Sequence, residues 1–547
     1  MPVPPRESFS HLVSGATTST TGPIDVEPRG SRLDDWWGRL LSTPGRRRLW
    51  YWGGPILVTL LAAVLRLWNL GTPHALVFDE TFYVKDAWTL LHHGYESAWP
   101  AESDPDFNAG RVNGFLTDPA YVVHPPLGKW LIALGLGVFG ATDSFGWRIS
   151  TAIIGTLAVL ILTLVARKLF ASTLLAVIAG FLFAIDGHAI VMSRVAILDN
   201  SLMFFALLGF AMILADRDWH ARRLAVRLDA ARSSGASPDW GPVIWWRPWL
   251  IAAGVAFGLA AGVKWSGFYF LAGFGLYLIV VDALARRRLG LDAWFSAAVL
   301  KQGPATFLLL VPVSLVVYLA SWTGWFVTDN GYYRNWAEQA GNAWTGLFSW
   351  VPSVWQSFFF YQQSIYNFHV GLAAPHPYSA NPLGWLALIR PTSMWYDSPA
   401  TGASGCELAP CSQAITSIAN PLIWWAAVAA SLYLVYRLIR TRQWQVGLIL
   451  MGVAAGYLPW LMYTERTVFQ FYTIAFLPYL LLALTFVIGL ILGKRSDSQY
   501  ERTRGLSVTA VFLVLATVLS AFWYPLWSAT TVPFWFWSLH SWLSTWV

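Results

Sequence analysis

The sequence predicts an all-α integral membrane protein that crosses the bilayer about eleven times. Its 547 residues are 56% hydrophobic and only 12% charged, whereas an average soluble domain has about 25% charged residues. Apolar runs long enough to cross a bilayer recur along the chain, and short clusters of Arg and Lys lie in every second loop between them. Such clusters are typical of topology determinants and not of a nucleic-acid surface, so we expect no nucleic-acid partner.

The chain begins with a polar segment, 1–45, that is rich in Pro, Ser, Thr and Gly. It contains no apolar run typical of a cleavable signal peptide, and its composition predicts a disordered tail. The first apolar run is therefore expected to act as an uncleaved signal anchor. Arg46, Arg47 and Arg48 precede that run and place the tail in the cytoplasm.

The predicted transmembrane helices are runs of about 20 mainly apolar residues. They cover roughly 50–68, 149–166, 173–191, 199–215, 248–263, 266–284, 304–321, 419–437, 444–463, 468–490 and 506–526. Basic clusters follow the even-numbered spans, for example at Arg167 and Arg286, and put those loops on the cytoplasmic side. An odd number of crossings then places the C-terminus outside.

A further apolar segment, 126–141, is short and rich in Gly. If it crossed the bilayer, every later basic cluster would move outside, so we expect a re-entrant or interfacial helix. The chain then divides into a transmembrane catalytic module 46–321 with a first external loop 69–148, a large external loop 322–418 and a C-terminal transmembrane module 419–547. Both large loops lie outside, which is where we expect the function.

The two cysteines, Cys406 and Cys411, lie close together in the second of these external loops. An extracytoplasmic position favours a disulfide. Two free thiols are the alternative, because so short a loop does not always reach disulfide geometry.

The first external loop opens with two adjacent carboxylates, Asp79 and Glu80, between the aromatic residues Phe78 and Tyr83. Apolar neighbours can desolvate a carboxyl group and raise its pKa towards that of a working base. One of the pair could therefore activate an acceptor hydroxyl. A solvated loop pair without function is the alternative.

Several cations are predicted at the same height. His124 and Lys129 flank a Pro-Pro turn before the short apolar segment, Arg148 stands at the mouth of the second span, and Lys264 lies in a very short external turn. Arg and Lys side chains there could bind the phosphate of a lipid-linked donor, or could be ordinary interface anchors.

Two more external positions carry charge. Asp199 begins the fourth span, where a helix cap is the simpler explanation. Arg466 lies beside Glu465 in the turn between the ninth and tenth spans, and the two charges could merely neutralise each other. The sequence has no zinc-ligand pattern, no Gly-x-Ser-x-Gly and no Walker loop, so we expect no metal site, zinc hydrolase or ATPase.

Four motifs, in order, resemble those of a known family. They are Phe78-Asp79-Glu80-Thr-Phe-Tyr83, His124-Pro-Pro-Leu-Gly-Lys129, Leu198-Asp199-Asn200 and Gly262-Val-Lys264-Trp-Ser-Gly267. The chain resembles the protein O-mannosyltransferases, and specifically their actinobacterial branch, over residues 50–527. The eukaryotic members carry a large β-trefoil insertion, for which segment 322–418 is too short.

The resemblance implies a C-type glycosyltransferase fold and an enzyme of the plasma membrane. It implies transfer of mannose from polyprenyl phosphate mannose to Ser or Thr hydroxyls of secreted proteins, with inversion. Asp79 would be the general base and Glu80 its support, and the donor phosphate and its pocket would involve Arg66, His124, Lys129, Arg148, Asp199, Lys264 and Arg466. No obligatory cofactor follows, although a divalent cation on the phosphate is compatible with these residues.

Two alternatives stay open from the sequence. The first is another polyprenyl-phosphate sugar transferase, which would add a pentose or aminopentose to a lipid or glycan. The second is a non-enzymatic scaffold or lipid carrier in which the charges only cap helices. The acidic pair favours an enzyme, because a scaffold does not need it.

Overall fold

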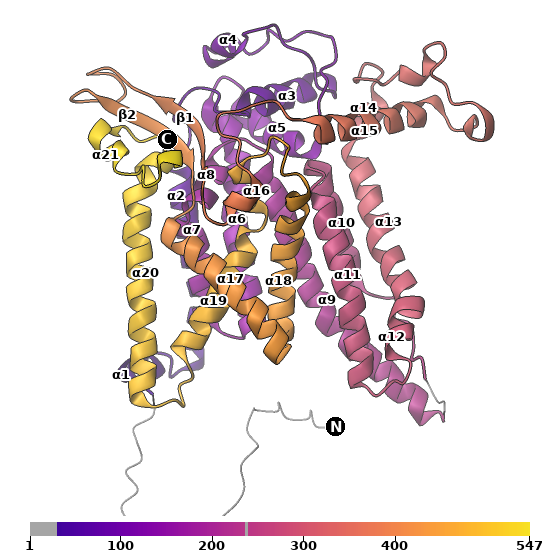
Figure 1. Cartoon of the computed structure of the whole chain (residues 1–547), viewed down its shortest axis with the longest axis vertical. Helices are drawn as coiled ribbons and strands as arrows, with labels where there is room; N and C mark the ends of the chain where they lie inside the picture. The colour runs from indigo at the N-terminus through magenta and orange to yellow at the C-terminus, as the bar shows by residue number, and fades with distance from the viewer. Residues whose placement is uncertain (1–29, 236–238, 547) are drawn as a thin grey trace, which may run out of the picture.

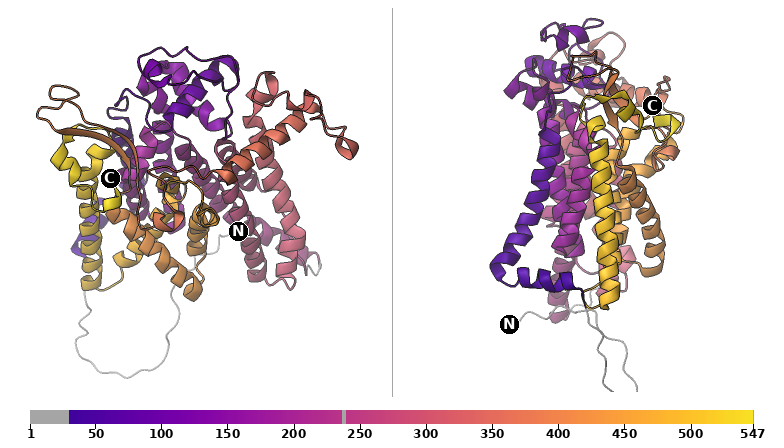
Figure 2. Two further views of the ribbon diagram at one scale, coloured as in Figure 1. Left: turned by 45° about the horizontal axis from the view of Figure 1, so that its top comes forward. Right: turned by 90° about the vertical axis from the view of Figure 1, so that its left-hand side faces the viewer.

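A computed structural model describes residues 30–235 and 239–546 of the chain (Figure 1). Long, roughly parallel helices form a bundle, and shorter helices and a β-hairpin gather at the end opposite α1 (Arg32–Leu40) (Figures 1 and 2). We call this the outer end.

Within the described ranges, 8 helical stretches are long and apolar enough to cross a membrane. They are α2 (Pro44–Leu67), α6 (Ser144–Phe170), α9 (Asp199–Ser233), α11 (Gly267–Arg288), the stretch Trp294–Ser321 formed by α12 (Trp294–Ser296), a π-helical turn (Ala297–Gln302) and α13 (Gly303–Ser321), α17 (Pro421–Thr441), the stretch Trp444–Met462 that begins with α18 (Trp444–Tyr457), and α20 (Gln499–Trp527). The prediction of a multi-span membrane protein is therefore confirmed.

The remaining predicted spans are helical but short or broken. Helices α7 (Thr173–Ile185) and α8 (Gly187–Arg194) form one apolar pair bent by 59°. Helices α10 (Pro248–Val263) and α19 (Leu477–Leu492) have 16 residues each, a rise of about 24 Å, whereas the hydrocarbon core is about 30 Å thick. Length alone thus supports 8 or 9 spans, and about eleven crossings stays a prediction.

The bend between α7 and α8 is held by side chains. Asp186 accepts a hydrogen bond from the backbone N–H of Ala189 and caps α8. Arg66 donates to the carbonyl oxygens of Phe183 and Ala184, at 3.2 and 3.1 Å, where α7 ends. A break inside a bilayer needs such partners, because lipid offers none to free backbone groups.

Helix α5 (Leu127–Phe139) covers the short apolar segment. Its 13 residues rise about 20 Å, and it packs between α6 and α3 (Glu80–His93) near the outer end. A re-entrant or interfacial helix stays a prediction.

Two stretches predicted to be irregular are helical. Residues 1–29 of the predicted disordered tail lie outside the described residues, but α1 forms within 30–45, where Ser31 and Asp34 make a capping box and Arg502 binds Asp34 at 2.9 Å. Helix α9 continues to Ser233, well beyond the predicted end of the span at 215.

The outer end contains further short elements. They are α4 (Asp104–Asn108), α14 (Thr323–Val327), α15 (Ser353–Gly371), α16 (Pro382–Trp385), α21 (Phe534–Ser538), strands β1 (Thr392–Asp397), β2 (Cys411–Ser417) and β3 (Val532–Pro533), and 3-10 turns at Trp336–Glu338, Gly346–Phe348, Leu458–Met462, Gln470–Ala475 and Ser544–Trp546. The strands form an antiparallel sheet in the order β1-β2-β3. The prediction of a purely α protein misses this sheet, because β1 and β2 are short strands in an external loop and β3 is a two-residue strand that follows the last span.

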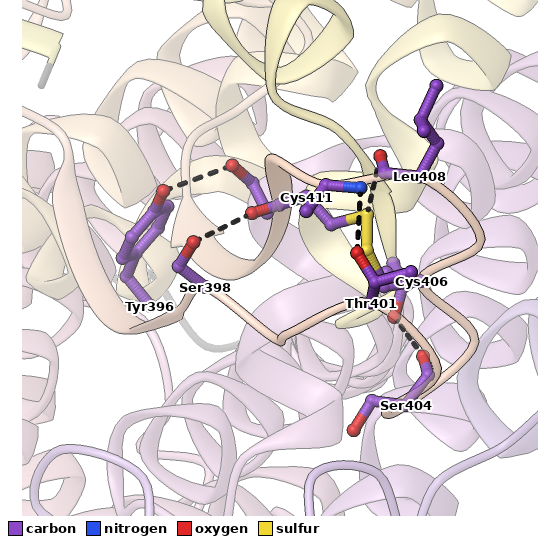
Figure 3. The surroundings of a disulfide bond; sticks show 10 residues. Tyr396, Ser398, Thr401, Ser404, Cys406, Leu408 and Cys411 are labelled. Atoms are coloured by element: carbon purple, nitrogen blue, oxygen red, sulfur yellow. Dashed lines mark hydrogen bonds between the residues drawn. A yellow bond between two sulfur atoms is a disulfide. The ribbon is translucent and has the colours of Figure 1, made fainter.

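The turn between β1 and β2 contains a disulfide between Cys406 and Cys411 (Figure 3). Around it, the Ser398 hydroxyl donates to the Cys411 carbonyl at 3.0 Å, and Thr401 accepts from the N–H of Ala409 at 3.3 Å. Of the two alternatives left open by the sequence, the structure has the disulfide.

Candidate active site

The start of α3 places Asp79 at the outer end of the bundle. Phe78 has a positive φ of 51°, a conformation that costs a non-glycine residue roughly 1–2 kcal/mol. Its ring makes edge contacts with the rings of His376, Phe469 and Phe471 at 5.8, 5.5 and 5.7 Å. Asp79 follows as the N-cap residue of α3, yet its side chain makes no capping hydrogen bond. The carboxylate is thus available for another role.

Asp79 lines a cavity of about 530 Å³, which we call the main cavity. Tyr83 and Asp86 line it from the same helix, because positions i, i+4 and i+7 share one helical face. Further residues that line it are Trp99, His124, Lys129, His369, Arg466, Phe469 and Tyr472.

The Asp79 carboxyl group is more basic than an exposed one. Burial raises its pKa, Lys264 lowers it, and the Asp199 carboxylate raises it again, to about 6. At neutral pH the group is therefore deprotonated, but it binds a proton more readily than an ordinary aspartate. These are the properties of a general base.

One wall of the main cavity consists of His124, His369 and Arg466, which we call the His-Arg wall. The two imidazole rings stack at 5.1 Å. His369 Nε2 donates to the carbonyl oxygen of Val123 at 2.8 Å, so its Nδ1 accepts from Arg466 Nη2 at 2.9 Å. Burial lowers the pKa of His124 and of His369, the latter to about 4, so both are neutral.

Two polar atoms of this wall are buried and have no partner among the described residues. They are Nδ1 of His124 and Nε of Arg466. An unsatisfied buried polar group normally costs about 1–3 kcal/mol, and such groups in a native protein often mark a place where a ligand completes the bonding. The wall can therefore receive an anion.

A second, smaller cavity of about 80 Å³ shares the His-Arg wall with the main cavity. Lys264 lines it, and the Lys264 ammonium binds Asp199 at 2.9 Å and lies 3.9 Å from the ring centre of Tyr472. Burial lowers the pKa of Lys264, but the Asp199 carboxylate more than offsets this and holds it above its ordinary value. A fixed positive charge thus stands beside the wall.

Known proteins are similar to this chain over most of its length. Residues 56–326 match the family model of dolichyl-phosphate-mannose-protein mannosyltransferase, and residues 354–546 match that of the C-terminal four TMM region of protein-O-mannosyltransferase. A polyprenol-phosphate-mannose–protein mannosyltransferase of Mycolicibacterium smegmatis is 33% identical over 506 residues, 90% of this chain and 93% of that protein. This chain belongs to the protein O-mannosyltransferase family.

Other members agree with this assignment. The Corynebacterium glutamicum polyprenol-phosphate-mannose–protein mannosyltransferase is 30% identical over 504 residues, 90% of this chain and 92% of that one. The Saccharomyces cerevisiae protein O-mannosyltransferase Pmt1-Pmt2 complex bound to the sugar donor superposes with a TM-score of 0.66 at 15% identity, covering 96% of both chains. The C-type glycosyltransferase fold expected of this protein O-mannosyltransferase is thereby confirmed.

The second carboxylate of the acidic pair lies elsewhere. In this protein O-mannosyltransferase Glu80 is fully buried and binds Arg148 through two hydrogen bonds of 2.8 Å. It also accepts from the backbone N–H groups of Val77 and Ala196, at 2.9 and 2.7 Å. Neither Glu80 nor Arg148 lines the main or the small cavity. The pair joins α3, α6 and the α8–α9 connection. The geometry therefore gives no support to the expected contact of Arg148 with donor phosphate, and the role of Glu80 as a support of Asp79 stays a prediction.

The other predicted residues divide in the same way. Arg66 holds the α7–α8 break, away from both cavities, so the expected contact with donor phosphate has no support in the geometry. Lys129 lines the main cavity, but it is paired with Glu96 and lies 3.8 Å from Asp86. Asp199 lines neither cavity and binds the Lys264 ammonium. Three of the predicted residues, Asp79, His124 and Arg466, line the main cavity, and Lys264 lines the small cavity that shares the His-Arg wall with it.

Sequence reasoning missed Asp86 and His369. Burial raises the pKa of Asp86 to about 7, against the lowering effect of Lys129, and its spacing of seven residues from Asp79 could have placed it on the same face of a helix. His369 gave no comparable signal. It reaches the site only because α15 folds over the loop that contains His124.

Proposed function

We propose that this protein transfers mannose from polyprenyl phosphate mannose to Ser or Thr hydroxyls of secreted proteins, with inversion. The proposal rests on one observation: two groups line the same cavity. They are the half-buried Asp79 carboxylate, which makes no capping hydrogen bond, and the His-Arg wall, which has two polar atoms without partners among the described residues. The names of the relatives state the same donor and a protein acceptor.

The reaction follows from these groups. Asp79 removes the proton of the acceptor hydroxyl as its oxygen attacks the anomeric carbon. The bond from that carbon to the phosphate oxygen breaks, and its electron pair leaves with the phosphate. Arg466 and Lys264 stabilise the developing charge, and His124 donates a hydrogen bond. Phosphate is a good leaving group, so the mechanism needs no general acid.

The site is proposed to act at the outer face of the plasma membrane, with the N-terminus in the cytoplasm and the C-terminus outside. Basic residues next to spans mark the cytoplasmic side. On the side of α1 these include Arg46, Arg167 and Arg286. The main cavity lies at the other end. We propose no obligatory metal, since fixed cations already face the phosphate, and we expect activity to survive EDTA.

A transfer assay tests the proposal directly. The purified full chain, polyprenyl phosphate mannose and a Ser/Thr-containing peptide are expected to give a peptide heavier by one hexose. A donor that carries a pentose serves as the matched comparison. A mass increase with the pentose donor alone would assign the chain to a different transferase class, and no increase with either donor would refute the proposal.

The pKa of Asp79 predicts how the rate depends on pH. Because its carboxyl group must be deprotonated to act as a base and its pKa is about 6, kcat/KM should fall about tenfold per pH unit below about pH 6 and level off above it. The profile is measured with saturating lipid donor and limiting peptide.

Asp86, with a pKa of about 7, is the competing source of such a profile. The Asp86→Asn variant should keep the inflection near pH 6, whatever its maximum rate. If the inflection disappeared in Asp86→Asn, the pH dependence would be assigned to Asp86, and this would contradict the role of Asp79.

A further inference from the structure

The outer end has a second hollow, lined by residues of the sheet, α20 and α21. These elements lie on the other side of the bundle from α15 (Figure 1). The volume of the hollow is about 450 Å³, and it lies between the sheet, the outer end of α20 and α21. We call it the outer aromatic groove. Six aromatic residues line it: Tyr378, Tyr396, Trp523, Phe534, Trp537 and Trp546.

The groove has unused hydrogen-bonding capacity. Trp523 is only 1% exposed, and its indole N–H has no partner among the described residues. A buried Trp N–H normally finds an acceptor. Hydroxyl groups of Ser393, Thr416 and Ser541 also line the groove. A ligand that fits here therefore offers hydrogen-bond acceptors as well as apolar surface.

The charge of the groove restricts its occupant further. Of the described residues that line it, none is Asp, Glu, Lys or Arg. His540, which also lines it, is kept neutral by burial, which lowers its pKa. An uncharged ligand suits such a surface better than a lipid phosphate or a charged peptide.

Aromatic side chains connect the groove with the main cavity. Tyr378 of the groove contacts His376 at a ring distance of 6.1 Å, and His376 contacts Phe469 at 4.9 Å. Phe469 lines the main cavity, and His376 also touches Phe78, the residue before Asp79. A chain bound in the groove can continue along this aromatic path towards the base.

Strand β1 lies on the rim of the groove, and its last two residues, Tyr396 and Asp397, are exposed. β1 lies at the edge of the sheet, with β2 as its partner. Its residues Ser393 and Tyr396 line the groove, and Tyr396 is 44% exposed. Edge strands bind extended peptides through backbone hydrogen bonds, and aromatic grooves bind extended chains that lack charge.

We propose that the outer aromatic groove binds an extended, uncharged segment of the acceptor polypeptide at a distance from the hydroxyl that is modified. The inference rests on the proposed function, because it takes a polypeptide as the acceptor. The groove holds the chain, and the aromatic path leads it to Asp79. Long acceptors thereby gain affinity that short peptides lack.

The test compares two acceptors that contain the same single Thr, one of about 10 residues and one of about 40, which extend to about 35 and 140 Å. The variant is Tyr396→Ala with Phe534→Ala, since both side chains line the groove and are 44% and 43% exposed. Removal of two aromatic contacts should raise KM for the long acceptor about tenfold and leave kcat unchanged. Both constants for the short acceptor should stay at the wild-type values.

The matched control is Phe348→Ala with Trp350→Ala. These aromatic residues are 57% and 75% exposed, and they line neither of the cavities nor the groove. The control should leave all four constants unchanged. An equal KM of the two acceptors in the wild type, or an equal change for both in the groove variant, would overturn the proposal.

Two further results would assign the groove to another ligand and would also overturn the proposal. A rise in KM for the lipid donor would indicate a lipid, and an effect confined to acceptors that already carry mannose would indicate a glycan. Failure of the proposed function looks different, since the wild type would then modify neither acceptor.

Discussion

Replacement of Asp79 by asparagine is expected to lower kcat by a factor of about 10²–10⁴, the usual contribution of a general base. Asparagine keeps the size of the side chain but cannot take the proton of the acceptor. Because Asp79 makes no capping hydrogen bond in α3, the fold does not depend on its charge. Single-turnover transfer from polyprenyl phosphate mannose measures the effect, together with the melting temperature of the purified protein.

The control for this variant is Asp118→Asn. Asp118 is an exposed carboxylate in the same external loop, and it lines neither the main nor the small cavity. It should retain the wild-type rate. Undiminished transfer by Asp79→Asn would contradict the assignment of the base, and an equal loss in Asp118→Asn would indicate a general effect of charge.

Replacement of Arg148 by methionine is expected to destabilise the protein by about 3–5 kcal/mol, the usual effect of removing one partner of a buried ion pair. The change would leave the Glu80 carboxylate enclosed without its partner. It would also free the carbonyl oxygens of Pro73 and Ala75, to which Arg148 donates at 2.8 Å. Thermal unfolding in detergent and the yield of monodisperse protein measure the loss.

The double variant Glu80→Gln with Arg148→Met separates charge from packing. Glutamine keeps an acceptor oxygen for one of the two backbone N–H groups that Glu80 binds through different oxygens, and it removes the uncompensated charge. We expect it to be more stable than Arg148→Met alone. Its folded fraction should also keep a kcat well above that of Asp79→Asn. A double variant less stable than the single one would contradict the account.

Much of the bundle could be predicted because apolar length and basic loops act locally along the chain. Each predicted span is helical in the structure. The count of crossings is less accessible, since α10 and α19 are short and the α7–α8 pair is bent. Such features depend on partners such as Arg66, which belongs to another helix. The β-sheet was not predicted for the same reason, because β3, which pairs with β2, is more than a hundred residues away in the sequence.

The candidate site was predicted in part. The predicted topology puts four of its residues in segments on one side of the membrane, which is enough to bring them to one end of the bundle. They are Asp79, His124, Lys264 and Arg466. Whether a side chain at that end faces a cavity or the interior depends on the rotation of its helix, which the sequence does not specify. Glu80 and Arg148 therefore resembled site residues, although they bind each other. His369 could not be predicted, because it reaches the site only when α15 folds over the loop that contains His124.

The enclosure of Glu80 beside Asp79 has a practical consequence for anyone who interprets a mutational scan. Successive residues of a helix differ in direction by about 100°, so one carboxylate of the pair faces the main cavity and its neighbour faces Arg148. Loss of either would abolish product in an assay on cell extracts. Only a rate normalised to the amount of folded protein separates the two causes, so two equally inactive variants here would report on chemistry in one case and on assembly in the other.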